Sequence, residues 1–359
     1  MKLFTLGPTE MGDDLLRLAG TQPPYYRTSE FYDLTNQNKQ ILLDLAETEE
    51  GSEAAFLTGS GTAAMEASLI NFFDEHSQLL IINGGAFGER YTRIAKTHKI
   101  NFHELKMQPG ESLKAAHLEP LRTKHFDGIV VNGHESSAGV LYDLELLGRF
   151  ARSKNALFVC DAVSTFLADE YHMKEWGIDV TVTSSQKAMC LHPGMSFILL
   201  SPRAIRQLRP EPATFYLNLN YYIKEIKKGW VPFTPAVSIM QQLNLRLKEI
   251  QRIGKKSFIK SIEHLASDFR ERVKTLPFRV CSERPSNALT PLSPVETEIS
   301  AYRIFEVLKD KYSVMVSPTE GERKKSLIRV GHIGHLTAED NKVLAESLKG
   351  ALAILRSEK

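Results

Sequence analysis

The chain has 359 residues, a length that suits one large domain together with a smaller one. Hydrophobic residues make up 42% of it and charged residues 25%, which are ordinary values for globular proteins and exclude disordered, fibrous and membrane classes. Forty-five basic against 43 acidic side chains give a net charge of +2, so there is no general electrostatic case for a nucleic-acid or anionic-membrane partner.

The three cysteines, Cys160, Cys190 and Cys281, lie far apart and follow no spacing typical of metal or redox sites. We therefore expect reduced thiols and no bound metal. The N-terminus lacks the apolar stretch of a signal peptide, and no apolar run approaches membrane-spanning length. These features predict a cytoplasmic protein.

The first elements are an extended, proline-rich segment at residues 23–28 and a helix at 29–47. Arg27 on the extended segment could reach an anion, or it could form an ordinary surface ion pair. Residues 56–69 then predict a strand, a tight glycine turn and a helix. The N–H groups that follow Gly61 suit a phosphate, although such turns also serve plain packing and this one lacks the Walker lysine.

Strands and helices alternate through the next part of the chain, which predicts a mostly parallel sheet covered by helices. In such sheets ligands bind beyond the carboxyl ends of the strands, where Gly61, Glu135, Asp161 and Lys187 are all expected. The predicted strands are residues 79–83, 101–106, 128–132, 156–160, 179–183 and 196–200, and the predicted helices are residues 88–98 and 143–154.

Beyond Pro202 the alternation stops, and residues 236–252 predict a long helix that continues to about 275. Thr337 begins a terminal helix with a capping-box pattern. Between them we expect strands at 278–281, 288–291, 314–316 and 327–331 and a helix at 300–311. We divide the chain into an N-terminal segment (1–25) that packs near the active site and the small domain, a large domain (26–240) and a small C-terminal domain (241–359).

Lys187 is the residue around which the chemistry is arranged. The β-branched run before it places Lys187 at a strand end, where burial would lower the pKa of its amine and free the lone pair to form an imine. A single lysine is more often a solvated loop residue. Asp161 follows another strand, 26 positions earlier, and a buried carboxylate can keep a heterocyclic nitrogen protonated. Together with the phosphate turn, these features describe a pyridoxal phosphate site, in which Phe87 would stack on the ring or serve only packing.

Five motifs resemble, in order, those of the class V, fold-type I aminotransferases. The closest branch is that of alanine-glyoxylate and serine-pyruvate aminotransferases, with 2-aminoethylphosphonate-pyruvate aminotransferase nearby. The resemblance extends through residues 233–236 and 328–331 and so covers nearly the whole chain. It implies an α/β fold in which a large domain with a mostly parallel seven-stranded sheet, covered by helices, is joined to a smaller α+β C-terminal domain. The motifs are Gly59–Ala67, Asn83–Arg90, Glu135–Leu141, Asp161–Ser164 and Ser185–Ala188.

The resemblance also implies roles for the residues around the cofactor ring. Lys187 would carry the internal aldimine, and Asp161 would pair with the pyridine nitrogen. Val163 and Phe87 would pack on opposite faces of the ring, and Ser136 would reach the ring oxygen.

A second set of residues would hold the phosphate. Gly61 and Thr62 would bind it through the backbone and a hydroxyl, with Ser60 beside them, and Gln186 would lie next to the lysine near this group. Thr234 matches a threonine that relatives supply from the neighbouring subunit. The resemblance therefore implies a homodimer with shared active sites.

Arg329 matches the family arginine that forks onto the substrate carboxylate, a task that suits a planar guanidinium. Without the resemblance, a structural ion pair would be as good an interpretation of Arg329 as substrate binding. Arg27 is the second substrate-binding candidate.

The chain departs from the family pattern at several positions. Gly133 stands where relatives commonly have histidine, and His134 follows it; we interpret His134 as a satisfied loop histidine rather than a ring-facing group. Val231 replaces a tyrosine that contacts the phosphate in some relatives, so that contact is missing or supplied by Trp230. Cys190 is interpreted as a packing residue.

The sequence thus predicts a ping-pong aminotransferase that moves an amino group from a small amino acid of the alanine or serine type to pyruvate or glyoxylate. The runner-up is transfer from 2-aminoethylphosphonate. A desulfurase that uses Cys281, a non-catalytic binding protein of the same fold and a nucleotide-binding protein are weaker alternatives.

Overall fold

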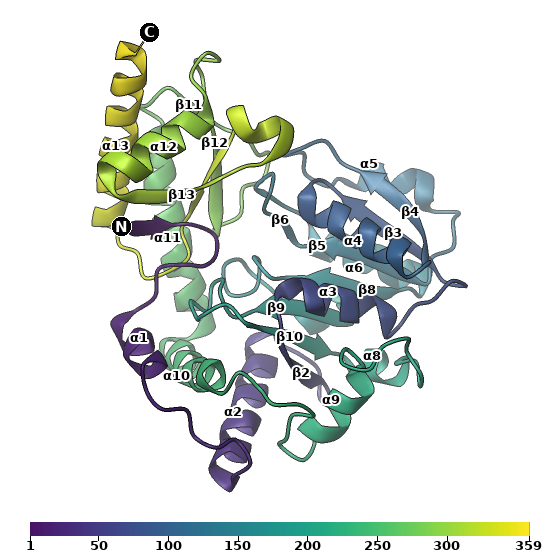
Figure 1. Cartoon of the computed structure of the whole chain (residues 1–359). Coiled ribbons are helices and arrows are strands. Elements are labelled where there is room, and N and C mark those ends of the chain that lie inside the picture. The colour runs from purple at the N-terminus through teal and green to yellow at the C-terminus, as the bar shows by residue number, and fades with distance from the viewer. Residues whose placement is uncertain (359) are drawn as a thin grey trace.

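A seven-stranded sheet forms the centre of the larger unit in the computed structural model, which describes residues 1–358 (Figure 1). Strand β10 is antiparallel to both of its neighbours, and the other neighbouring strands are parallel. The predicted α/β fold with a mostly parallel seven-stranded sheet is confirmed. In spatial order the strands are β2 (Glu53–Thr58), β10 (Met195–Leu200), β9 (Val180–Ser184), β8 (Leu157–Asp161), β5 (Gly128–Asn132), β3 (Gln78–Asn83) and β4 (Asn101–Lys106).

The central strands are buried along their whole length, because helices cover the sheet and parallel strands in this setting carry apolar runs. Some polar side chains within them are paired. The Thr181 hydroxyl on β9, for example, lies 2.6 Å from the Tyr171 hydroxyl. Burial on both faces leaves the strand ends as the places where polar chemistry can reach solvent.

Several helices of this unit begin at a side-chain N-cap. Thr28 accepts a hydrogen bond from the Phe31 amide at the start of α2, and Asp143 accepts one from the Leu146 amide at the start of α6. The helices are α1 (Asp13–Ala19), α2 (Ser29–Leu45), α3 (Gly61–Ile70), α4 (Ala86–Thr97), α5 (Ala115–Leu118), the 3-10 turn η1 (Glu119–Leu121), α6 (Leu144–Lys154), α7 (Met173–Trp176), α8 (Pro202–Arg206) and α9 (Leu219–Ile226).

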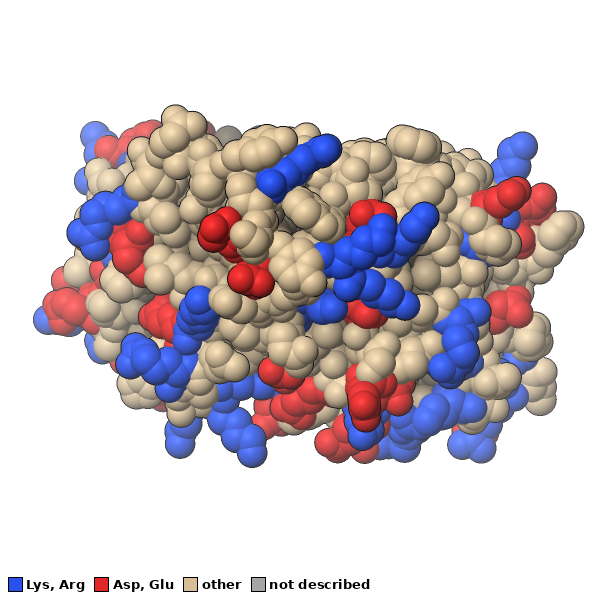
Figure 2. All heavy atoms as spheres, turned by 90° about the horizontal axis from the view of Figure 1, so that it is seen from below, with Lys and Arg blue, Asp and Glu red and all other residues tan. Residues whose placement is uncertain are grey.

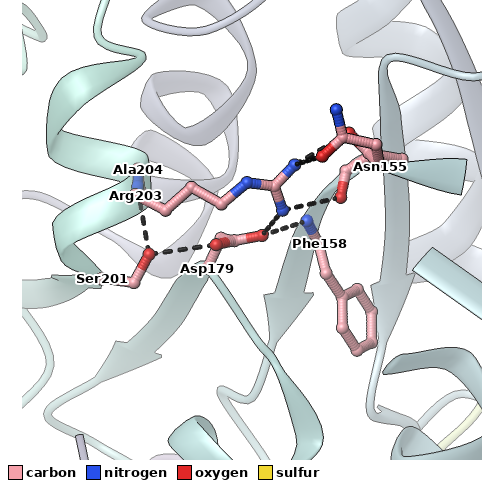
Figure 3. A network of polar contacts seen from close by, with 7 residues as sticks. Asn155, Phe158, Asp179, Ser201, Arg203 and Ala204 are labelled. Atoms are coloured by element: carbon pink, nitrogen blue, oxygen red, sulfur yellow. Dashed lines mark hydrogen bonds and ion pairs between the residues drawn. The ribbon is translucent and has the colours of Figure 1, made fainter. Parts of the chain in front are cut away.

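Asp179 fixes the amino-terminal ends of β8 and β9, at the edge opposite the candidate site (Figure 3). Its carboxylate accepts hydrogen bonds from the Phe158 amide at 2.9 Å, the Ser201 hydroxyl at 3.0 Å and Arg203 Nη1 at 2.9 Å. Arg203 also donates to the backbone carbonyl of Asn155 at 2.8 Å. The network fixes the register between β8 and β9. It therefore also fixes the relative positions of the residues at the carboxyl ends of these strands.

The smaller unit is built on a five-stranded sheet with the order β1-β13-β14-β12-β11. The N-terminal strand β1, which was not predicted, pairs in parallel with β13, and Phe4 is buried in the core of this unit. Figure 1 shows both chain ends on this unit. Its elements are β1 (Lys2–Phe4), α11 (Lys255–Val273), β11 (Phe278–Val280), β12 (Leu289–Pro294), α12 (Ala301–Tyr312), β13 (Val314–Pro318), the 3-10 turn η2 (Gly321–Lys325), β14 (Ile328–Gly331) and α13 (Ala338–Ser357).

The long helix predicted from residue 236 to about 275 is two helices. Helix α10 (Val237–Ile253) packs on α2, and α11 packs on α13. Gly254 separates them with φ +91°, a conformation that a continuing helix does not allow. The break lets one segment serve both units.

The charged side chains are mixed on the surface. Figure 2 shows basic and acidic residues interspersed with broad uncharged areas on the face seen from below. Within residues 1–358, no helix has the length and apolar character needed to cross a membrane.

Candidate active site

Asp161 is the last residue of β8, and Lys187 lies just beyond the carboxyl end of the neighbouring strand β9. Burial lowers the pKa of the Lys187 amine to about 8, although the Asp161 charge opposes the shift. Burial also raises the pKa of Asp161 to about 6. Its carboxylate accepts hydrogen bonds from Asn132 Nδ2 at 2.6 Å and from the Val163 amide at 2.9 Å. The two residues thus form a poised amine beside a fixed, desolvated carboxyl group.

The glycine turn brings the start of α3 to the same strand ends. A β-carbon on Gly61 would lie 3.2 Å from Val163 Cγ2 and 3.7 Å from Ser184 Oγ, so a larger residue here would press on Val163. Ser60 is the N-cap of α3, yet its side chain caps no N–H group of the helix. The buried Ser184 hydroxyl has no hydrogen-bond partner among the described residues. These donors are available to an anion at the helix N-terminus.

Arg90 is a site residue that the sequence reasoning missed. Its Nη1 donates to the Thr62 hydroxyl at 3.0 Å, and its guanidinium carbon lies 4.7 Å from the centre of the Phe87 ring. The positive charge of Arg90 also contributes to lowering the pKa of Lys187. Its place three positions after Phe87, on the same face of α4, was the available signal.

Glu135 and Ser137 position the segment that carries Phe87. The Glu135 carboxylate accepts hydrogen bonds from the amides of Phe87 at 3.2 Å and Gly88 at 2.9 Å, and from the Ser137 hydroxyl at 2.6 Å. Glu135 therefore satisfies the first N–H groups of α4 and fixes the origin of Phe87. The buried carboxylate has a structural task that was not assigned to it from the sequence.

Arg329 lies on β14 of the small unit, and its side chain reaches the candidate site on the larger unit. Its Nη1 donates to the Ser136 carbonyl at 3.2 Å and its Nη2 to the Pro318 carbonyl at 2.7 Å, while the buried Nε has no partner among residues 1–358. Burial lowers its pKa, and the charge of Arg323 adds to this effect. Ser136 lies in the turn between β6 (His134–Glu135) and β7 (Val140–Leu141).

The N-terminal segment also reaches the lysine. A β-carbon on Gly7 would lie 2.8 Å from the Gln186 carbonyl oxygen and 3.1 Å from Lys187 Nζ. Gly7 has φ +151°, which favours glycine. The backbone at Gly7 therefore forms part of the wall around the amine.

Tyr26 bridges Arg27 and Thr234. The Tyr26 hydroxyl is 3.3 Å from Thr234 Oγ1 and accepts a hydrogen bond from Arg27 Nε at 3.2 Å. Both Arg27 and Thr234 are exposed. A surface hollow of about 660 Å³ beside them is lined by aromatic residues, including Phe215 and Phe233. The contacts of these two residues do not include Lys187 or Asp161.

The interpretation of His134 as a satisfied loop histidine is wrong. His134 lies on β6, is buried, and neither ring nitrogen has a hydrogen-bond partner among the described residues. Burial lowers its pKa to about 3, so the ring is neutral. Cys190, expected to be a packing residue, is buried, and burial raises its pKa. Trp230 packs edge-on against Tyr32, and its contact with a phosphate stays a prediction.

These residues fit a cofactor that carries an aldehyde, a basic ring nitrogen and a phosphate. The Lys187 amine is available near neutral pH, and a protonated ring nitrogen would offset the burial of Asp161. The unpaired Ser184 hydroxyl and the start of α3 suit the phosphate.

A family model described as aminotransferase class-V matches residues 22–330. The chain belongs to the class-V aminotransferase family. This confirms the family resemblance, and the chain is a pyridoxal phosphate-dependent aminotransferase. The special closeness to 2-aminoethylphosphonate-pyruvate aminotransferase stays a prediction.

Three similar proteins span nearly the whole aminotransferase chain. The soluble hydrogenase small subunit of Synechococcus sp. is 28% identical and covers 98% of this chain and 93% of its own. Alanine–glyoxylate aminotransferase of Rattus norvegicus is 24% identical, and the match covers 96% of this chain and 86% of that protein. The crystal structure of an aspartate aminotransferase of Thermus thermophilus has a TM-score of 0.91 at 25% identity and covers 98% and 99%.

Proposed function

We propose that this aminotransferase moves an amino group from a small amino acid to a 2-oxo acid such as pyruvate or glyoxylate by a ping-pong mechanism centred on Lys187. Alanine and serine are the first donors to test, on the strength of the alanine–glyoxylate relative. The observation that carries the proposal is the Lys187 amine, whose pKa is lowered to about 8 beside the buried carboxyl group of Asp161.

The residues that would hold pyridoxal phosphate come from five separate segments. Ser60, Gly61 and Thr62 would take the phosphate at the start of α3, together with Gln186. The ring would lie between Phe87 and Val163, with Asp161 on its nitrogen and Ser136 on its oxygen. When bound, the cofactor supplies an aldehyde that captures amines and a ring that accepts the electron pair released when the donor carbon loses its proton.

Lys187 would act twice. Its neutral Nζ is first the nucleophile that attaches the cofactor, and after the donor amine displaces it, the same Nζ carries the proton away from the donor carbon. Both tasks need an unprotonated amine near neutral pH, which the lowered pKa provides. The backbone at Gly7 lies against one side of this amine. Arg329 would orient the donor by its carboxylate.

We also propose a homodimer in which Thr234 reaches the partner's cofactor site. Thr234 is exposed on its own chain and lies beside a hollow rimmed by aromatic side chains, of which Phe215 is 70% exposed. Exposed aromatic clusters of this kind favour a protein interface. The cytoplasmic location expected from the sequence stays a prediction.

The test replaces Lys187 by alanine. We expect Lys187→Ala to lose amino transfer and to give no cofactor-derived mass on the protein after borohydride treatment. Lys106→Ala is the matched control, because Lys106 is the last residue of a parallel strand, β4, but its side chain is 77% exposed. A cofactor mass retained by Lys187→Ala, or equal losses in both variants, would refute the assignment.

A further inference from the structure

A second arginine lies next to the substrate-binding candidate Arg329. Arg323 is in η2, six positions before Arg329, and its Nη2 lies 3.5 Å from the Ser137 hydroxyl. Arg329 donates to the carbonyl of the preceding residue, Ser136. The two guanidinium groups therefore flank one short turn, the one that carries the ring-oxygen candidate.

Among the described residues, carboxylates act on these guanidinium groups only without direct pairing: the charges of Glu135 and Glu320 raise the pKa of Arg329 against the effect of burial. Within residues 1–358, neither Arg323 nor Arg329 takes part in an ion pair, and Arg329 Nε makes no hydrogen bond. The buried carboxylate nearest to the turn, that of Glu135, is occupied by four donors from Phe87, Gly88 and Ser137. Two guanidinium groups at one place, neither with an ion-pair partner among these residues, favour an anion with two negative charges.

The backbone holds Arg323 in place. Its carbonyl accepts hydrogen bonds from the buried Thr319 hydroxyl at 2.7 Å and from the Leu327 amide at 3.0 Å. The Thr319 hydroxyl also lies 2.8 Å from the Leu327 carbonyl, which closes the turn. The guanidinium thus projects from a fixed origin, which lowers the entropy cost of holding a ligand.

We propose that Arg323 forms, with Arg329, a subsite for a donor that carries two negative charges on its anionic groups. A dicarboxylic amino acid would place one carboxylate on each arginine, whereas an aminoalkylphosphonate would present one dianionic group to both. Either donor is preferred over alanine or serine. This inference rests on the proposed amino-transfer function and changes its preferred donor from alanine or serine to an amine with a dianionic group or a second carboxylate.

The experiment compares kcat/KM for aspartate, 2-aminoethylphosphonate and alanine with one common acceptor at constant ionic strength. In the wild type, aspartate or the phosphonate should exceed alanine. Arg323→Gln should lower kcat/KM for that donor roughly 10- to 100-fold, the effect of losing a charge-assisted hydrogen bond, and leave alanine within about threefold. Arg323→Lys, which keeps the charge without the fork, should recover part of the loss.

The matched control is Lys325→Gln, which removes one positive charge from the exposed side of the same turn. It should leave kcat/KM unchanged for every donor. Preference for aspartate identifies the dicarboxylate as the ligand, and preference for the phosphonate identifies that group. Equal losses for all donors, or no loss in Arg323→Gln, would overturn the subsite.

A binding measurement separates this inference from the function on which it rests. By calorimetry, succinate should bind more tightly than butyrate, and Arg323→Gln should abolish the difference. If no donor is converted but this result holds, amino transfer fails and the dianion subsite stands. If alanine is converted but succinate and butyrate bind alike in both proteins, the subsite alone fails.

Discussion

Replacing Gly7 by alanine should damage the site through the backbone rather than through any catalytic group. Gly7 has φ +151°, a region that side chains rarely adopt, and such strain costs about 1–3 kcal/mol. The added methyl would also lie 2.8 Å from the Gln186 carbonyl oxygen and 3.0 Å from Lys187 Cδ. The lysine side chain can rotate away, but the carbonyl belongs to the peptide that carries Lys187, so this peptide must move.

Gly254→Ala separates the two effects. Gly254 has φ +91°, and no atom lies within 4 Å of the position its methyl would take. It should therefore lose only the strain energy, about 1–3 kcal/mol in the free energy of unfolding measured in urea. Gly7→Ala should lose at least as much.

The distinguishing assay is the rate at which cofactor-free protein takes up pyridoxal phosphate covalently. Gly7→Ala should slow this uptake by roughly tenfold or more, because small displacements of reacting groups cost large factors in rate. Gly254→Ala should leave it unchanged. Normal uptake in Gly7→Ala, or the same slowing in both variants, would refute the reasoning that Gly7 positions the lysine.

Three further changes have defined outcomes. The rate of cofactor uptake should rise with pH through about 8, where the Lys187 amine loses its proton. Asp161→Asn should lower the midpoint of this pH profile, because the Asp161 charge raises the pKa of Lys187. A midpoint shifted to higher pH would contradict this. Asp179→Ala should reduce the free energy of unfolding by about 2–3 kcal/mol, because the partly buried Arg203 loses its ion-pair partner and the Phe158 amide loses its acceptor, and an unchanged urea midpoint would count against the network. Phe215→Asp should shift the dimer toward monomer in sedimentation, whereas Val343→Asp, at an exposed apolar position on α13, should not; identical behaviour of the two would place the interface elsewhere.

Much of the secondary structure could be predicted because its signals are local. Thr28 and Asp143 cap helices through amides three residues away, and Thr337 forms the capping box with Asp340. The buried strands could be predicted from their mostly apolar runs. These patterns need no knowledge of the rest of the chain.

Other features were missed because their partners are distant in sequence. Strand β1 has three residues and exists because Leu3 pairs with Met315 on β13. The orphaned ring of His134 depends on what surrounds it, and a sequence pattern cannot report whether a buried nitrogen finds a partner. The break at Gly254 was overlooked because the apolar period continues on both sides.

The sequence by itself determined the fold class, the family and the order of the strand-end residues, because caps, periodicity and motifs act over a few neighbouring positions. Only the tertiary structure placed Arg90 on Thr62, Arg323 beside Arg329 and Gly7 against Lys187. It also decided the lowered pKa of Lys187 and the raised pKa of Asp161. Desolvation and charge proximity arise from segments that meet only when the chain is folded, so no local pattern encodes them.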